Sequence, residues 1–281
     1  GAAGGAGASK KDDKHAMYGE MINKMPQFAH VGQLFTSSAS VDLTESEAEY
    51  CVSVVKHIYP KHVVFQFTIK NTMEEQQLED VEVKMDLSDA PSCRVESHAP
   101  AEVIKYGQPG VAFVCVERAD AIGSIFVKAS KLVFKVKEVD PSTGEVYDEA
   151  AEEEYPLDEL EVSTSDYCKP ADLADFRRSW EATTPDNDLV EEFRLERQKS
   201  IADTVQGLVD TLGMEPCEKS ASVSAAARTH RLLLGGIFLG GCQTLVRADL
   251  RMAQTAGVEM KVTIRTEDLA VSEAVLEAIS S

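Results

Sequence analysis

The sequence predicts a mixed fold, with an antiparallel β-sandwich in the first part of the chain and an α+β domain in the second. Two observations lead to this prediction. Between residues 34 and 165, runs rich in β-branched and aromatic residues alternate with turn sequences, without a convincing helical pattern. After residue 165, helical and strand patterns are mixed and end in an apparent hairpin. We therefore expect two domains, at 28–165 and 166–281.

The first 27 residues are predicted to be a flexible linker, a hinge or an expression tag. Residues 1–9 read GAAGGAGAS, which can bury almost no apolar surface and has high backbone freedom. The next six residues, KKDDKH, are charged and should be solvated. Ordered structure is therefore expected to begin near Phe28.

The strands of the first domain are predicted from alternation. In VVFQFTIKNT (63–72), Phe65, Phe67 and Ile69 fall on one face at a period of two. Comparable runs predict strands at 50–60, 78–87, 110–118, 124–139 and 156–163. Residues 148–161 contain eight acidic residues and no basic one, which is typical of either a solvated loop or a strand edge.

The elements of the second domain are predicted from capping and periodicity. Pro170 is placed to begin a helix that runs through KPADLADFRRSWEA (169–182). In SIADTVQGLVDTLGM (200–214), apolar residues share one helical face, with Ser200 as N-cap and Gly213 as the stop. Strands are expected at 188–197, 230–241, 242–254 and 257–267, and a last helix at 268–280.

Composition excludes several classes of function. The formal net charge is −20, which disfavours nucleic acid and anionic lipid as direct partners. The most apolar run, at 232–242, has about half the length that spans a bilayer. No signal peptide is recognised, and the six cysteines form no CxxC pair, so we expect reduced cysteines in a cytosolic protein. The cysteines and histidines lack metal-ligand spacing, which predicts neither a metal nor a cofactor.

Signatures of enzymes are absent from the sequence. It contains no GxSxG, GxxxxGK[ST] or GxGxxG motif. The glycine-rich GGIFLGG (235–241) lies within a hydrophobic strand pattern, which favours close backbone packing or a β-bulge over a phosphate loop. We therefore predict that the protein is not an enzyme and has no catalytic residues.

One segment opposes the acidic character of the chain. Residues 219–265 contain seven basic and only two acidic residues. With a turn near Thr255, alternation leaves Arg247 and Arg265 on the outer face of a hairpin, diagonal neighbours without acidic partners. The same register predicts two opposite-charge pairs, Arg251 with Glu259 and Asp249 with Lys261. The two arginines are either ordinary solvated residues or a site for an acidic ligand.

The single tryptophan of the chain, Trp180, lies in DFRRSWEA (175–182). Helical spacing places Leu173, Phe176 and Trp180 on one face. This pattern is compatible with a place in the core. It is also compatible with an aromatic anchor that captures short peptides with acidic flanks.

Several stretches in order resemble the C-terminal appendage, or ear, of the coatomer gamma subunit in the COPI vesicle coat. They are LTESEAEY (43–50), VFQFTIKNT (64–72), DPSTGEVYDEAAEEEYPLDELEV (140–162), GLVDTLGMEPCE (207–218), THRLLLGGIFLGG (229–241) and LVRADL (245–250). The resemblance implies an immunoglobulin-like β-sandwich at 28–165 followed by an α/β platform subdomain at 166–281, as in adaptor appendages.

The resemblance also implies a function. Appendages of this family are non-catalytic recruitment modules whose platform binds proteins at a site centred on a tryptophan. Phe176 and Trp180 match that element, and Arg247 and Arg265 match basic positions beside it. Leu239 stands where animal members have an arginine, which implies a weaker basic rim.

The partners implied are an ARF GTPase-activating protein, the other coatomer subunits and short motifs with aromatic and acidic residues. The implied location is the cytoplasm and the surface of the Golgi membrane and COPI-coated vesicles, where contact with the membrane is only indirect. The alternative interpretation is an ear domain of a clathrin adaptor that binds short aromatic and acidic motifs.

Overall fold

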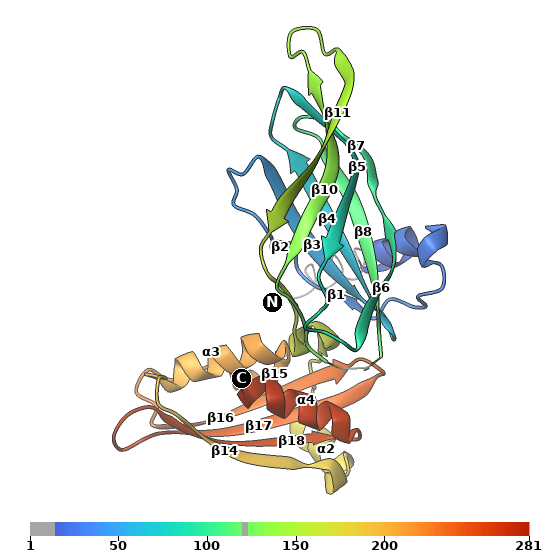
Figure 1. Ribbon diagram of the computed structural model, residues 1–281. Helices are drawn as coiled ribbons and strands as arrows, with labels where there is room; N and C mark the ends of the chain where they lie inside the picture. The colour runs from blue at the N-terminus through green and yellow to red at the C-terminus, as the bar shows by residue number, and fades with distance from the viewer. Residues whose placement is uncertain (1–14, 120–122, 281) are drawn as a thin grey trace, which may run out of the picture. The chain divides into compact units, whose positions relative to one another are not determined.

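The computed structural model describes residues 15–119 and 123–280 (Figure 1). Antiparallel sheets dominate this part of the chain, and helices accompany them mainly in its second half. The predicted mixed β and α+β class is therefore confirmed. The chain forms two compact units, one ending at Val162 and the other beginning at Ser163, and each is described by itself.

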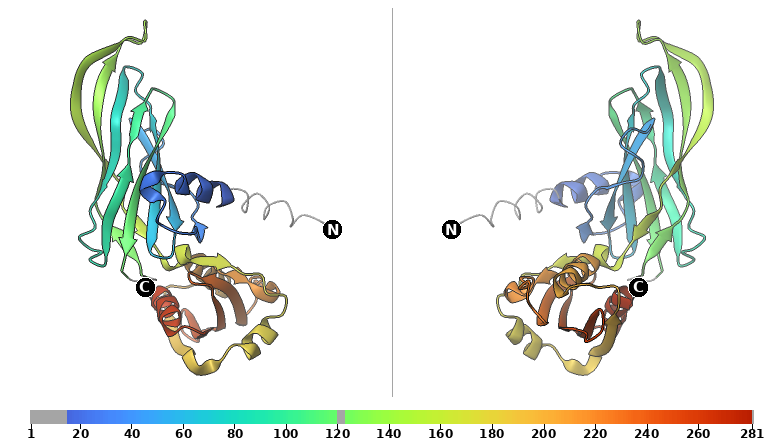
Figure 2. Two further views of the ribbon diagram at one scale, coloured as in Figure 1. Left: turned by 90° about the vertical axis from the view of Figure 1, so that its right-hand side faces the viewer. Right: turned by 90° about the vertical axis from the view of Figure 1, so that its left-hand side faces the viewer.

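The first unit is a sandwich of two antiparallel sheets, seen as separate layers in Figure 2. One sheet has the order β1-β3-β4-β8-β6, with β2 also paired to β3; its strands are β1 Thr36–Ser37, β2 Val41–Asp42, β3 Tyr50–Ile58, β4 His62–Asn71, β6 Cys93–Ala99 and β8 Pro109–Arg118. The second sheet has the order β11-β10-β5-β7; its strands are β5 Gln76–Met85, β7 Ala101–Ile104, β10 Ser130–Val139 and β11 Val146–Leu157. A separate ladder joins β9 Ile125–Val127 to β12 Leu160–Val162.

The core between the two sheets is built from the alternating residues that the sequence identifies. Phe65, Phe67 and Ile69 are fully buried on one face of β4. Val64, which points to the opposite face, is buried as well, because the N-terminal segment covers that side of the sheet. The first half of β4 is therefore buried on both faces, although its sheet belongs to a sandwich.

The prediction of a linker or tag at 1–27 is wrong for residues 15–27. Residues 15–23 form a helix, drawn in blue in Figure 2, and Pro26–Phe28 form a short 3-10 helix, η1. Ile22 and Phe28 are fully buried against the outer face of the β4 sheet. The apolar residues of YGEMINKM (18–25) recur at helical spacing, so they share one face of the helix. Burial of that face offsets the entropic cost of ordering this segment. Residues 1–14 lie outside the described residues.

The acidic stretch at 148–161 belongs mainly to β11, which is the edge strand of its sheet. Of its two alternatives, the strand edge is therefore correct. Charged side chains on an edge strand hinder pairing with other chains, which explains the composition. The strands β6 and β7 were not predicted, because β6 is largely exposed and shows no apolar alternation.

The second unit has one antiparallel sheet with helices on both faces (Figure 1). The strand order is β13-β16-β17-β18-β14, with β15 also paired to β16; the strands are β13 Cys168–Pro170, β14 Leu189–Leu195, β15 Glu215–Pro216, β16 Thr229–Phe238, β17 Cys242–Met252 and β18 Val258–Thr266. Val246, Ala248 and Leu250 are buried on the face covered by the helices α3 (Ile201–Leu212) and α4 (Leu269–Ser280). The short helix α2 (Phe176–Ala182) packs on the opposite face.

The capping predictions hold for α3 but not for α2. The Ser200 hydroxyl accepts a hydrogen bond from the Asp203 amide, and Gly213 ends α3 in the left-handed conformation, with φ of 62°. The prediction that α2 begins at Pro170 is wrong, because Pro170 pairs with β16 as the last residue of β13. Asp175 instead caps α2 by accepting from the Arg178 amide.

In the described part of the chain, no helix has the length and apolarity needed to cross a membrane.

Candidate protein-binding site

Trp180 lies on α2, over the face of the sheet that α3 and α4 leave uncovered. Its ring stacks on Phe176, with 5.6 Å between ring centroids and 28° between ring planes. Phe176 is only 4% exposed and packs against Leu245 and Cys217, whereas Trp180 is half-buried. The two aromatic residues therefore differ, because Phe176 belongs to a small core and Trp180 reaches from that core to the surface.

The glycine-rich strand β16 allows the segment before α2 to approach the sheet closely. A Cβ atom on Gly235 would lie 2.8 Å from both the Ala171 carbonyl oxygen and the Leu173 Cδ1 atom. Leu173 precedes the helix and packs into the same cluster as Phe176. The expected close backbone packing at GGIFLGG is therefore present, and it seats α2 on the sheet.

The strand register brings both predicted arginines to Trp180. Arg247 pairs with Thr263 across β17 and β18, as the turn near Thr255 predicted. The Arg247 Cζ atom lies 5.1 Å from the centroid of the indole, and that of Arg265 lies 4.4 Å from it. Both distances are within the range of cation–π attraction. The structure thus brings all four predicted site residues together.

The prediction that Arg265 has no acidic partner is wrong. Its Nε and Nη2 atoms donate to the two carboxylate oxygens of Asp188 at 2.8 and 2.6 Å. Its Nη1 atom donates to the carbonyl oxygen of Trp180 at 2.8 Å. The two side chains are only 14% and 18% exposed, so the pair is largely shielded from water. Asp188 escaped prediction because it lies 77 residues away from Arg265, outside the hairpin.

Arg247 has an acidic neighbour as well, but a weaker one. Its Nε atom lies 3.7 Å from Asp249 and makes no hydrogen bond to any residue that the structure describes, while the side chain stays 36% exposed. Asp249 also accepts from the Nε atom of Arg231 at 2.6 Å, so one carboxylate is shared between two arginines. A net positive charge therefore remains beside Trp180, and the guanidinium of Arg247 is within reach of a ligand.

The other charged residues of this face form ion pairs, and Leu239 is buried. Arg251 pairs with Glu259 in register and donates to it from Nε at 3.0 Å. Lys261 is opposite Asp249 as predicted, but its ammonium group lies 3.4 Å from Glu192 of β14. Leu239 is buried and its amide donates to the carbonyl oxygen of Tyr167, so it presents little surface to a ligand.

The site combines an indole face with a guanidinium cation, which bind aromatic and anionic groups. Burial raises the pKa of Cys217, the thiol in the same cluster as Phe176, so it remains a protonated thiol at neutral pH.

Two family models match this chain, one over each of its two units. A family model described as the coatomer gamma subunit appendage platform subdomain matches residues 16–163. Another, described as the coatomer subunit gamma-1 C-terminal appendage platform, matches residues 165–279. Together the two matches take in nearly all the residues that the structure describes.

Individual relatives agree with the family matches. Coatomer subunit gamma of Arabidopsis thaliana is 40% identical over 264 residues, which are 94% of this chain and 30% of the relative. Coatomer subunit gamma of Dictyostelium discoideum is 38% identical over 92% of this chain and 29% of its own length. Coatomer subunit gamma-2 of Homo sapiens is 36% identical over 94% of this chain and 30% of its own length. The chain thus spans about 30% of the length of these relatives.

Proposed function

Because the chain belongs to the coatomer gamma-subunit appendage family, we propose that it is a non-catalytic recruitment module of the COPI coat. It acts in transport from the Golgi to the endoplasmic reticulum and within the Golgi. Its platform recruits accessory proteins, above all an ARF GTPase-activating protein, through a site centred on Trp180. The observation that carries this proposal is the half-buried indole, seated on Phe176 and flanked by two guanidinium groups.

The four residues of the site have different roles in binding. Phe176 fixes the indole from beneath, so little side-chain entropy is lost when a ligand stacks on it. Arg265 is committed to Asp188 and to the Trp180 carbonyl, and it therefore positions the anchor. Arg247 is the arginine that meets an acidic group of the ligand. This arrangement suits a short motif that combines an aromatic with an acidic residue.

The two units take different roles in this proposal. The platform subdomain, which begins at Ser163, carries the binding site, and the immunoglobulin-like sandwich, which ends at Val162 and includes the helix at 15–23, links it to the rest of the coat. The other coatomer subunits are the remaining partners. The module works in the cytoplasm at the Golgi membrane and on COPI-coated vesicles, and contacts the membrane only indirectly through the coat.

The alternative is an ear domain of a clathrin adaptor that binds short aromatic and acidic motifs. Such a domain would use the same kind of shallow site. Membership of the coatomer gamma family counts against it, and motif peptides from the two transport systems distinguish them directly.

The test is capture of an ARF GTPase-activating protein by the purified chain with Trp180→Ser. We expect binding to weaken by about 30-fold, corresponding to a loss of about 2 kcal/mol for a central aromatic anchor. Isothermal titration with the purified partner fragment measures the loss, and circular dichroism verifies the fold. Undiminished binding by a folded Trp180→Ser variant contradicts the proposal.

A matched pair of variants separates the site from the charge of the sheet face. Arg247→Ala and Arg251→Ala each remove one arginine from β17, but only Arg247 lies over the indole. We expect Arg247→Ala to weaken binding by about tenfold, a loss of roughly 1.4 kcal/mol, and Arg251→Ala to leave it unchanged. Equal losses in both variants mean that the ligand senses the overall charge and not the Trp180 site.

A further inference from the structure

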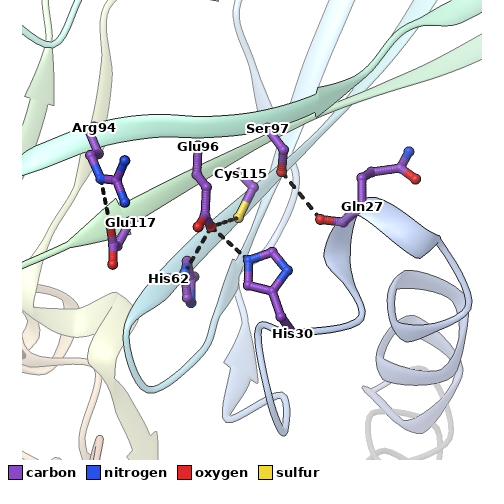
Figure 3. A network of polar contacts seen from close by, with 8 residues as sticks. All are labelled: Gln27, His30, His62, Arg94, Glu96, Ser97, Cys115 and Glu117. Carbon is purple, nitrogen blue, oxygen red and sulfur yellow. Dashed lines mark hydrogen bonds and ion pairs between the residues drawn. The ribbon is translucent and has the colours of Figure 1, made fainter.

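Two histidines and a glutamate meet in the first unit (Figure 3). The Nε2 atom of His30 lies 2.8 Å from the Oε2 atom of Glu96, and that of His62 lies 3.0 Å from the same oxygen. The potential ligand atoms of all three residues are within 4.8 Å of one another. We propose that His30, His62 and Glu96 form a zinc site, whose fourth position is filled by water.

The backbone brings these residues together from three separate segments. His62 is the first residue of β4, and His30 follows η1 between the buried residues Phe28 and Val31. Glu96 is the extra residue of a β-bulge, where the pairing of β6 with β8 shifts between Val95 and Ser97. A bulge re-aims a side chain and often occurs at a functional site. Here it turns the carboxylate of Glu96 toward both imidazoles (Figure 3).

His62 supplies an independent indication that a ligand belongs here. Its side chain is only 10% exposed, yet within the described part of the chain neither ring nitrogen makes a hydrogen bond. The contact to Glu96 is close, but its geometry is not that of a hydrogen bond. A buried polar group without a partner costs free energy, which a metal ion on Nε2 would recover.

Two of the three separations between ligand atoms are close to those of a tetrahedral zinc site, and the third, between the two imidazoles, is within 4.8 Å. Zinc bonds of about 2.0–2.1 Å place neighbouring ligand atoms about 3.3 Å apart. The separations of 2.8 and 3.0 Å between each imidazole and Glu96 therefore need to widen by about 0.3–0.5 Å. His30 and Glu96 are both exposed, so an ion can enter from solvent without opening the core.

The donor set selects zinc over the common hard cations. Two imidazole nitrogens and one carboxylate suit zinc, whereas calcium and magnesium prefer oxygen ligands throughout. The other nearby carboxylate, Glu117, is held by the Nε atom of Arg94 at 2.6 Å and does not compete for the ion. The Cys115 thiol lies 4.0 Å from Glu96 and is fully buried, so it lines the inner side of the site.

Zinc at this position would connect the N-terminal segment to the sheet. Besides the apolar cluster of Ile22, Phe28 and Val31, two polar contacts attach that segment to β6: His30 to Glu96, and the Ser97 hydroxyl to the Gln27 carbonyl oxygen at 3.4 Å. His30 and Glu96 are 66 residues apart in the sequence and are now joined by one hydrogen bond at the surface. Bonds from both residues to one zinc ion would replace it. The site thus stabilises the covering of the sandwich by residues 15–35.

The experiment is a calorimetric titration of untagged, chelator-treated protein with zinc chloride. We expect one saturable site per chain, and a loss of affinity of at least about tenfold in both His30→Gln and Glu96→Gln. His98→Gln is the matched control, because His98 also faces a glutamate, Glu82, at 3.8 Å but has no third ligand among the described residues. Its zinc affinity should equal that of the wild type.

A second readout separates a metal site from a hydrogen-bonded cluster. Cobalt in place of zinc should give the visible absorption of a tetrahedral ion, and zinc should raise the melting temperature of the wild type but not of Glu96→Gln. Both ligand variants replace exposed side chains, so their folding without metal can be verified by circular dichroism. Absence of saturable zinc binding, or equal affinity in the wild type and both ligand variants, overturns the proposal. A loss in His98→Gln as large as in the ligand variants overturns it as well.

Discussion

The clamp between Asp188 and Arg265 offers a sharp test of how the platform holds Trp180. We predict that Asp188→Asn destabilises the second unit. The substitution keeps the size of the side chain but replaces one carboxylate oxygen by an amide group, which cannot accept from Arg265. The guanidinium then keeps one hydrogen bond to residue 188 and the bond to the Trp180 carbonyl.

The magnitude follows from the burial of the pair. A hydrogen bond between charged groups contributes about 1.5–3 kcal/mol, and breaking a fully buried ion pair costs about 3–5 kcal/mol. Arg265 and Asp188 are 14% and 18% exposed, so water compensates only part of the loss. We therefore expect the free energy of unfolding to fall by about 2–3 kcal/mol.

The assay is urea denaturation followed by the emission of Trp180. Because Trp180 is the only tryptophan, its signal reports the second unit specifically. The control is Glu259→Gln, which breaks the more exposed pair with Arg251, whose side chains are 38% and 69% accessible. Its cost should stay below about 1 kcal/mol. An Asp188→Asn variant within about 0.5 kcal/mol of the wild type refutes the reasoning, and so does an equal loss in the control.

Two further predictions concern buried side chains. Phe176→Ala should lower the free energy of unfolding by about 3 kcal/mol, because it removes the ring that packs on Leu245 and supports Trp180. Urea denaturation followed by Trp180 emission measures this loss. A loss below about 1 kcal/mol contradicts the packing. Burial lowers the pKa of His57 from 6.5 to about 4, so the unfolded chain binds a proton in this range that the folded chain does not. Stability should therefore fall as the pH drops from about 6.5 to about 4, by up to about 1.4 kcal/mol per pH unit. In His57→Gln, the urea midpoint of denaturation should depend less on pH over this range than in the wild type. An unchanged pH dependence contradicts the assignment of this effect to His57.

The elements that could be predicted from sequence are those whose pattern is local. The hairpin register of β17 and β18 followed from alternation and one turn, and it correctly paired Arg247 with Thr263. The caps of α3 at Ser200 and Gly213 followed from residue types with a specific hydrogen-bonding or conformational role. Each of these predictions depends on residues that are close in the sequence.

The features that escaped prediction depend on contacts between distant segments. Asp188 meets Arg265 only because β14 pairs with β18, and no periodicity connects the two residues. His30, His62 and Glu96 have no ligand spacing in the sequence, and a bulge in β6 joins them. The helix at 15–23 was missed for another reason, since the glycine-rich start of the chain concealed a short amphipathic pattern.

The position of Trp180 shows why the sequence alone left its role open. An apolar face at helical spacing indicates burial, and the stack on Phe176 satisfies that expectation. The helix has only seven residues, so its cluster is too small to enclose the indole, and two guanidinium groups lie over its ring. Arg265 is held in place by Asp188, whereas the Arg247 side chain stays 36% exposed and lies 3.7 Å from Asp249. The same residue therefore packs on the local core and reaches the surface, as the proposed recognition role requires, and the two interpretations of the pattern are not exclusive.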